Sequence, residues 1–243
     1  MLNKENLILP YYSNIEIKKE SATIRLNSMK KAWSFYGDVF TKIADITNVP
    51  VELLFCFGMV ESGKFMAQGK SPGWINEKTG QERNYLGVMQ ISPIFADDRL
   101  LNNRKDYSKE EKIFISQNFG LVGEAIALDD TQKLKIYDKK AVSNKLFTKQ
   151  EMAKTPQNIF LGAQMIISLL KQKWAIVGNK VLLERVIVGY NAGPGKAVSS
   201  GATAQTPLQI LGNPNLPLES KNYIRVFLGN GGYLNLWKLH FEK

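Results

Sequence analysis

The most constraining feature of this 243-residue chain is a nearly continuous apolar segment that ends at a carboxylic acid. Pro50 precedes residues 51–60, in which Glu52 is the only charged side chain, and Glu61 follows directly. Proline favours the start of a helix, and a helix that is apolar on almost every side lies inside a core. The segment therefore predicts a buried helix that carries the Glu61 carboxyl into a partly dehydrated position, where desolvation raises its pKa.

Apolar residues elsewhere recur mostly at spacings of three and four, which is the period of an α-helix. We expect further helices over about 24–46, 155–177, 181–190 and 218–228, with Ser21 able to cap the first and Thr155 the second. The polar, glycine-rich stretch 63–85 predicts a long loop or a short hairpin that lines a cleft. No segment alternates cleanly, so the predicted fold class is mainly α, with room for one small β-hairpin.

Length and composition fit one globular domain, because 44% of the residues are hydrophobic and 22% are charged. We expect residues 1–21 to form an N-terminal arm and residues 22–243 to form a single domain. The apolar stretches are too short to cross a bilayer, and the apolar stretch at the N-terminus is too short for a secretory signal. We therefore expect no transmembrane segment and no signal peptide.

Cysteine and histidine usage excludes several kinds of site. The single cysteine, Cys56, excludes an internal disulfide and is interpreted as a small buried hydrophobe. The single histidine, His240, lies three residues from the C-terminus, and no motif links it to a nucleophile. Without a histidine and cysteine cluster, we expect no metal site and no cofactor.

Five segments, taken in order, carry a family resemblance. They are Glu61-Ser62; Gly87-Val88-Met89-Gln90; Asn158-Ile159 with Gly162; Gly189-Tyr190-Asn191-Ala192-Gly193; and Glu219-Ser220 with Tyr223. Together they resemble the soluble lytic transglycosylase family of the lysozyme superfamily, over roughly residues 45 to 228. The family pattern has Ala where Gly189 stands and Thr where Ser220 stands, and the second change keeps the hydroxyl.

The resemblance implies a lysozyme-like fold and a peptidoglycan lytic transglycosylase. In that family the acid that matches Glu61 protonates the β-1,4 bond between N-acetylmuramic acid and N-acetylglucosamine. As a carboxylate it then takes the proton of the C6 hydroxyl, which attacks C1 and gives a 1,6-anhydro end. Substrate-binding roles are implied for Ser62, Met89, Gln90, Tyr190, Asn191 and Tyr223. Gln90 and Asn158 are farther apart than in compact family members, so we expect a helical insertion over about residues 97–150.

Three other functions stay open. Goose-type lysozymes have the same scaffold but hydrolyse, using acids in the loop after the catalytic glutamate to position water, and Glu77 and Glu82 lie in that loop here. Asp97 and Asp98 follow the Gln90 motif and are further candidates. A non-catalytic wall-binding component of a virion or secretion channel is the second alternative, and a basic nucleic-acid binder is the third.

A net charge of +10 favours polyanionic partners. The basic residues are spread along the chain without a nucleic-acid-binding signature, so we expect anionic wall polymers and peptidoglycan glycan strands as partners, and no specific nucleic acid. We expect a monomer that is made in the cytoplasm and acts at the bacterial cell wall. A holin, a virion or a secretion machine would take it there, and a bacteriophage lysin is the favoured setting.

Overall fold

The computed structural model describes residues 7–8, 12–17, 19–102, 107–119 and 148–242, and this part of the chain is mainly helical, as predicted. The longer helices are α1 (Lys19–Thr47), α2 (Val51–Met66), α3 (Pro93–Asn102), α4 (Lys109–Asn118), α9 (Thr155–Leu170), α10 (Leu183–Ala192), α13 (Leu218–Leu228) and α14 (Tyr233–His240). The shorter helices are α8 (Lys149–Ala153), α11 (Pro194–Ser199) and α12 (Pro207–Gly212). The strands are β1 (Leu7–Ile8), β2 (Tyr12–Glu16), β3 (Ile176–Val177), β4 (Lys180–Leu182) and β5 (Gly229–Asn230).

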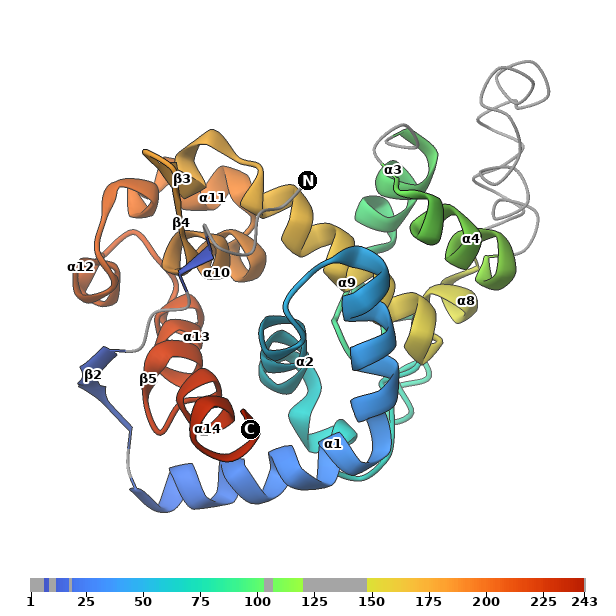
Figure 1. The fold of residues 1–243 in the computed structure, drawn as a ribbon, viewed down its shortest axis with the longest axis horizontal. Helices are drawn as coiled ribbons and strands as arrows, with labels where there is room; N and C mark the ends of the chain where they lie inside the picture. The colour runs from blue at the N-terminus through green and yellow to red at the C-terminus, as the bar shows by residue number, and fades with distance from the viewer. Residues whose placement is uncertain (1–6, 9–11, 18, 103–106, 120–147, 243) are drawn as a thin grey trace.

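Helix α2 lies at the centre of the molecule, where it packs against α1, α9, α13 and α14 (Figure 1). Its residues 53–59 are all buried, which confirms the predicted core helix, and Cys56 is a buried free thiol. The Phe55 ring meets Trp33 at 5.0 Å and Phe40 at 5.2 Å, both edge to face. Burying one such side chain contributes about 1.5–3 kcal/mol, so this aromatic cluster holds α2 firmly in place.

The described residues include a small hairpin at 176–182, where the sequence predicted the end of one helix and the start of the next. Strands β3 and β4 pair in antiparallel fashion across Gly178, which has a φ of 62°. Helix α9 ends at Leu170 instead of continuing to about residue 177, because the β-branched Ile176 and Val177 favour a strand before a glycine turn. Helix α2 continues to Met66, so residues 63–66 of the predicted loop are helical, and residues 67–85 form a loop that contains an isolated bridge between Ile75 and Glu82.

The N-terminal segment adds strands to the body of the molecule. Strand β1 pairs in parallel with β4, and β2 pairs in parallel with β5. Helix α1 begins at Lys19, so Ser21 lies inside it and not at its cap. Thr155 is likewise the first residue of α9 and not its cap, which is Lys154. These short pairings tie residues 7–8 and 12–16 to the C-terminal half.

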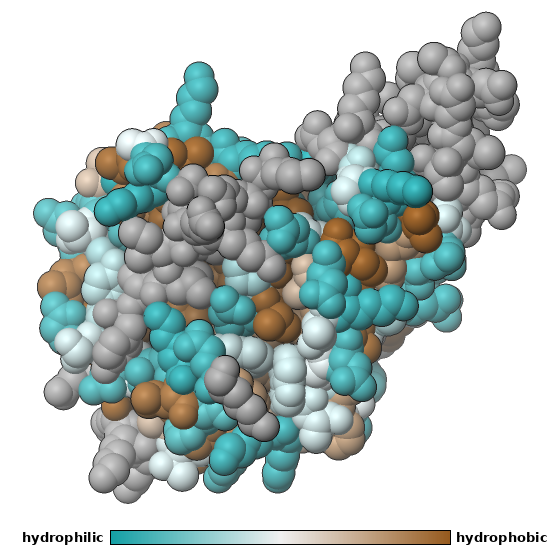
Figure 2. All heavy atoms as spheres, in the orientation of Figure 1, coloured by the Kyte–Doolittle hydropathy of each residue, from teal (hydrophilic) through white to brown (hydrophobic). Residues whose placement is uncertain are grey.

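Part of the expected insertion is described, namely α3, α4 and α8, while residues 120–147 lie outside the described chain. A buried polar chain links two of these helices to α9: Arg99 donates to Gln164 at 3.2 Å, and Gln164 donates to Glu111 at 2.5 Å. On the face shown in Figure 2, hydrophilic residues cover much of the surface and hydrophobic ones lie between them in small groups. No described helix is long and apolar enough to span a bilayer.

Candidate functional site

Glu61 lies at a break in α2. The next residue, Ser62, leaves the helical conformation, with φ −145° and ψ 23°. Its buried hydroxyl donates to the Val88 carbonyl at 2.6 Å. The acid therefore stands where α2 is fastened to the turn formed by residues 86–91.

That turn is closed by two backbone hydrogen bonds between Leu86 and Ile91, each 3.0 Å long. Gly87 and Gln90 both have a positive φ, 66° and 48°. A Cβ at Gly87 would lie 2.2 Å from Cγ of Asn158, so only glycine fits there. The side-chain amide of Gln90 donates to the Gly87 carbonyl at 2.7 Å, which adds a further hydrogen bond across the turn.

The Asn158 side chain, near the start of α9, locks the turn. Its Oδ1 accepts from the Met89 amide at 2.7 Å, and its Nδ2 donates to the carbonyls of Leu86 at 2.8 Å and Met152 at 2.9 Å. Asn158 is fully buried, so shortening its side chain would leave the Met89 amide without a partner, while the Leu86 carbonyl would keep only its backbone hydrogen bond from Ile91. Met89 is also fully buried, packed over Gly162, and it lies beneath the turn.

Two tyrosines from different helices converge on the acid. Tyr223, on α13, donates its hydroxyl to Oε1 of Glu61 at 2.8 Å. Tyr190, on α10, donates to the Met89 carbonyl at 2.8 Å. The Phe57 ring lies 4.4 Å from the Tyr190 ring and 6.3 Å from that of Tyr223, so the core of α2 sets the position of both phenols.

Burial raises the pKa of Glu61 to about 7, as the sequence predicted in direction. The hydrogen bond from Tyr223 lowers this pKa, while the nearby Glu219 carboxylate raises it. Burial and the Glu61 charge raise the pKa of Tyr190 and of Tyr223 well above the usual range, so both remain hydroxyl donors. A carboxyl with a pKa near 7 can both give and accept a proton at neutral pH.

Glu61 opens into a cavity of about 450 Å³. The cavity is lined by Glu61, Tyr85, Gln90, Ser92, Phe95, Met165, Tyr190, Asn191, Ala192, Gly193 and Glu219. A second depression, of about 290 Å³, shares Glu61, Asn191 and Glu219 with it. A third, of about 310 Å³, shares Tyr85 and Gln90. These shared residues make the three depressions neighbours, and we call them together the groove; Glu61 lines two of them.

The predicted site residues fall into three groups. Glu61, Gln90, Tyr190 and Asn191 line the central cavity, and Tyr223 binds Glu61 and lines the adjoining depression. Ser62 and Met89 lie behind them and hold the turn. Glu77 and Glu82 are exposed and do not line the central cavity, and the side chains of Asp97 and Asp98 lie outside the described part of the chain.

Several residues that line the cavity, Glu219 and Tyr85 among them, were not predicted as site residues, and neither was Ser220, which lies behind the lining. Glu219 lines both the central cavity and the depression beside it. Ser220 is buried and donates to Oδ1 of Asn191 at 2.6 Å, which orients that amide. The sequence could have indicated Glu219, because it lies four residues before Tyr223 and so lies on the same face of the predicted helix. Among the described residues, no cluster of three or more histidine, cysteine or acidic side chains could hold a metal ion.

No protein-family model, curated protein or solved structure matches this chain. Its function is therefore inferred from the groove and from the five segments that line or support it.

Proposed function

We propose that this protein is a peptidoglycan lytic transglycosylase with a lysozyme-like fold. It cleaves the β-1,4 bond between N-acetylmuramic acid and N-acetylglucosamine and leaves 1,6-anhydromuramic ends. The observation that carries the proposal is a largely buried Glu61, with a pKa of about 7, that lines a cavity continuous in its lining with two neighbouring depressions. Acid–base catalysis is most effective when the pKa of the catalytic group lies near the working pH.

In the first step, protonated Glu61 gives its proton to the bridging oxygen as the bond to C1 breaks. The substrate's own N-acetyl group stabilises the positive charge that develops at C1, so a second carboxylate is not required. The Tyr223 hydroxyl, 2.8 Å from Oε1, stabilises the carboxylate that forms. That carboxylate then takes the proton of the C6 hydroxyl, which attacks C1, and the acid is restored.

The walls of the groove suit an amino sugar polymer. The side-chain amides of Gln90 and Asn191 line the central cavity. The Ser220 hydroxyl donates to Oδ1 of Asn191 and so fixes the orientation of that amide. Amides offer donors and acceptors for hydroxyl and N-acetyl groups. The exposed Tyr85 ring, at the junction of two depressions, offers an apolar face for a sugar ring.

Hydrolysis on the same scaffold is the second candidate, because Glu219 also lines the central cavity. A carboxylate there provides a base that a goose-type muramidase needs to position water. Glu77 and Glu82, the acids expected in this role, do not line that cavity. Non-catalytic wall binding is a third reading, in which the raised pKa of Glu61 would have no use.

Analysis of the muropeptides released from purified peptidoglycan separates these readings. Anhydro ends support the transglycosylase, reducing ends support the hydrolase, and no release by the unaltered protein supports wall binding alone. Glu61→Gln should abolish release while wall binding remains. Glu52→Gln is the matched control, because it removes a carboxyl from the first turn of the same helix.

The setting remains part of the proposal. A net charge of +10 suits retention on anionic wall polymers. Delivery by a holin, a virion or a secretion machine fits a wall-degrading enzyme of this kind, with a bacteriophage lysin as the favoured case.

A further inference from the structure

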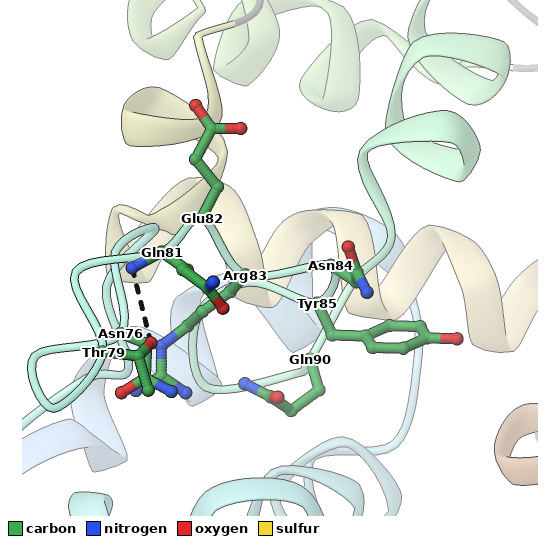
Figure 3. A pocket seen from close by; sticks show the side chains of 8 residues that line it. All are labelled: Asn76, Thr79, Gln81, Glu82, Arg83, Asn84, Tyr85 and Gln90. Atoms are coloured by element: carbon green, nitrogen blue, oxygen red, sulfur yellow. Dashed lines mark hydrogen bonds between the residues drawn. The ribbon is translucent and has the colours of Figure 1, made fainter.

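The third depression of the groove lies beyond Tyr85 and Gln90, on the side of loop 76–85 (Figure 3). Its lining is rich in neutral hydrogen-bonding side chains: Asn76, Thr79, Gln81, Asn84, Tyr85 and Gln90. The two charged side chains that line it are Glu82 and Arg83. Since Tyr85 and Gln90 also line the central cavity, a substrate held at Glu61 can extend into this depression.

The two charges of the depression are not equivalent. Glu82 forms an ion pair with Lys149 of α8, and Figure 3 shows its carboxylate pointing away from Gln90 and Arg83. Arg83 makes one side-chain hydrogen bond, from Nε to the Ile75 carbonyl at 3.4 Å, among the described residues. Its terminal nitrogens are therefore free for a ligand, and the net charge available in the depression is positive.

Backbone hydrogen bonds hold the loop in place on both sides of Arg83. The Arg83 amide donates to the Trp74 carbonyl at 2.9 Å, and the Asn76 amide donates to the Gln81 carbonyl at 2.8 Å. Arg83 is partly buried, so its guanidinium is less screened than that of a fully exposed arginine. A positioned guanidinium binds a carboxylate through two parallel hydrogen bonds, which favours an anionic and planar group.

We propose that this depression is a second subsite, in which Arg83 binds a carboxylate carried by a muramic acid residue. This inference rests on the proposed function, since it concerns the same glycan as the Glu61 site. The carboxylate has two possible sources with the same chemistry: the lactyl group of a peptide-free muramic acid, or the stem peptide attached to it. The asparagine and glutamine side chains around it would hold the neighbouring amides or hydroxyls.

Titration calorimetry on the Glu61→Gln variant tests the subsite without turnover. Three tetrasaccharides serve as probes: a neutral one of N-acetylglucosamine alone, a peptide-free one with N-acetylmuramic acid, and the same one with stem peptides. Adding Arg83→Gln should weaken binding of a carboxylate-bearing probe about tenfold, because hydrogen bonds to charged groups are strong. The neutral probe should change less than about twofold. Lys78→Gln is the matched control, since Lys78 is an exposed cation of the same loop that does not line the depression.

Loss with the peptide-bearing probe alone identifies a carboxylate of the stem peptide. Loss with the peptide-free acidic probe alone identifies the lactyl carboxylate, which is an amide in the peptide-bearing probe. Loss with both acidic probes shows that Arg83 binds either carboxylate. The inference is overturned if Arg83→Gln weakens all three probes equally, if it weakens none, or if Lys78→Gln has the same effect. Wall lysis by the unaltered protein is scored separately. Arg83-dependent binding without lysis would remove the proposed function and leave the subsite, and lysis without Arg83-dependent binding would do the reverse.

Discussion

Removing the Tyr223 hydroxyl should move the pH dependence of wall lysis in a direction that the geometry determines. This hydroxyl donates to Glu61 at 2.8 Å and lowers the pKa of that carboxyl, which burial has already raised to about 7. A hydrogen bond to a charged group is worth about 1.5–3 kcal/mol, and 1.36 kcal/mol corresponds to one pKa unit. Tyr223→Phe should therefore raise the pKa of Glu61, by about one to two pH units.

The sign follows from the first chemical step, which needs protonated Glu61. Activity is lost as pH rises through the pKa of this group, so the alkaline limb of kcat/KM should have its midpoint near pH 7 in the unaltered protein. Tyr223→Phe should shift this limb to higher pH, while the maximum rate falls because the carboxylate intermediate loses its donor. The assay is the initial rate of turbidity loss of purified peptidoglycan across a range of pH.

Tyr190→Phe is the control for this experiment. It removes another buried hydroxyl of the groove, but one that donates to the Met89 carbonyl and not to Glu61. Its alkaline limb should stay in place even if the protein becomes less stable. An unmoved limb in Tyr223→Phe, or one displaced to lower pH, would refute the role assigned to the Tyr223–Glu61 hydrogen bond.

Three further predictions concern stability, each measured by denaturant unfolding followed by circular dichroism. The folded protein binds a proton at Glu61 more tightly than the unfolded chain does, so its stability should fall as pH rises from about 4.5 to about 7. Glu61→Gln should remove this pH dependence. At pH 8 the variant should be more stable than the unaltered protein by about 1–3 kcal/mol. Asn158→Ala should cost about 3 kcal/mol, because it leaves the buried Met89 amide without a partner and removes one of the two donors to the Leu86 carbonyl. A cost below about 1 kcal/mol would argue against this role of Asn158. Gly87→Ala should be at least as damaging, since its Cβ would lie 2.2 Å from Cγ of Asn158 at a φ of 66°, whereas Gly80→Ala, with open space around it at a φ of 68°, should cost about 1 kcal/mol.

The central helix and the character of its acid follow from local sequence. Residues 53–59 are apolar on all sides, so they can only be buried, and Glu61 is carried in with them. The prediction that desolvation raises the pKa of Glu61 is confirmed. The mainly helical class follows in the same way, from spacing alone.

The supporting contacts of the site depend on residues far apart in the chain. Asn158 reaches a carbonyl at residue 86, and Ser62 reaches one at residue 88, and no local pattern specifies which backbone group a polar side chain will find. The β3–β4 hairpin was missed for a related reason, since Ile176 and Val177 fit a helical period as well as a strand. Strands as short as β1 and β5 carry no periodic signal at all, so their parallel pairings could not be read from the sequence.

The hydrogen bond between Glu61 and Tyr223 spans 162 positions of the chain. During synthesis, the acid at position 61 leaves the ribosome long before the phenol that completes its surroundings. A nascent chain would thus be without its finished proton donor until α13 has been made and packed. Under the proposed function, the acid would therefore be without its hydrogen-bond donor until the C-terminal part of the chain has folded.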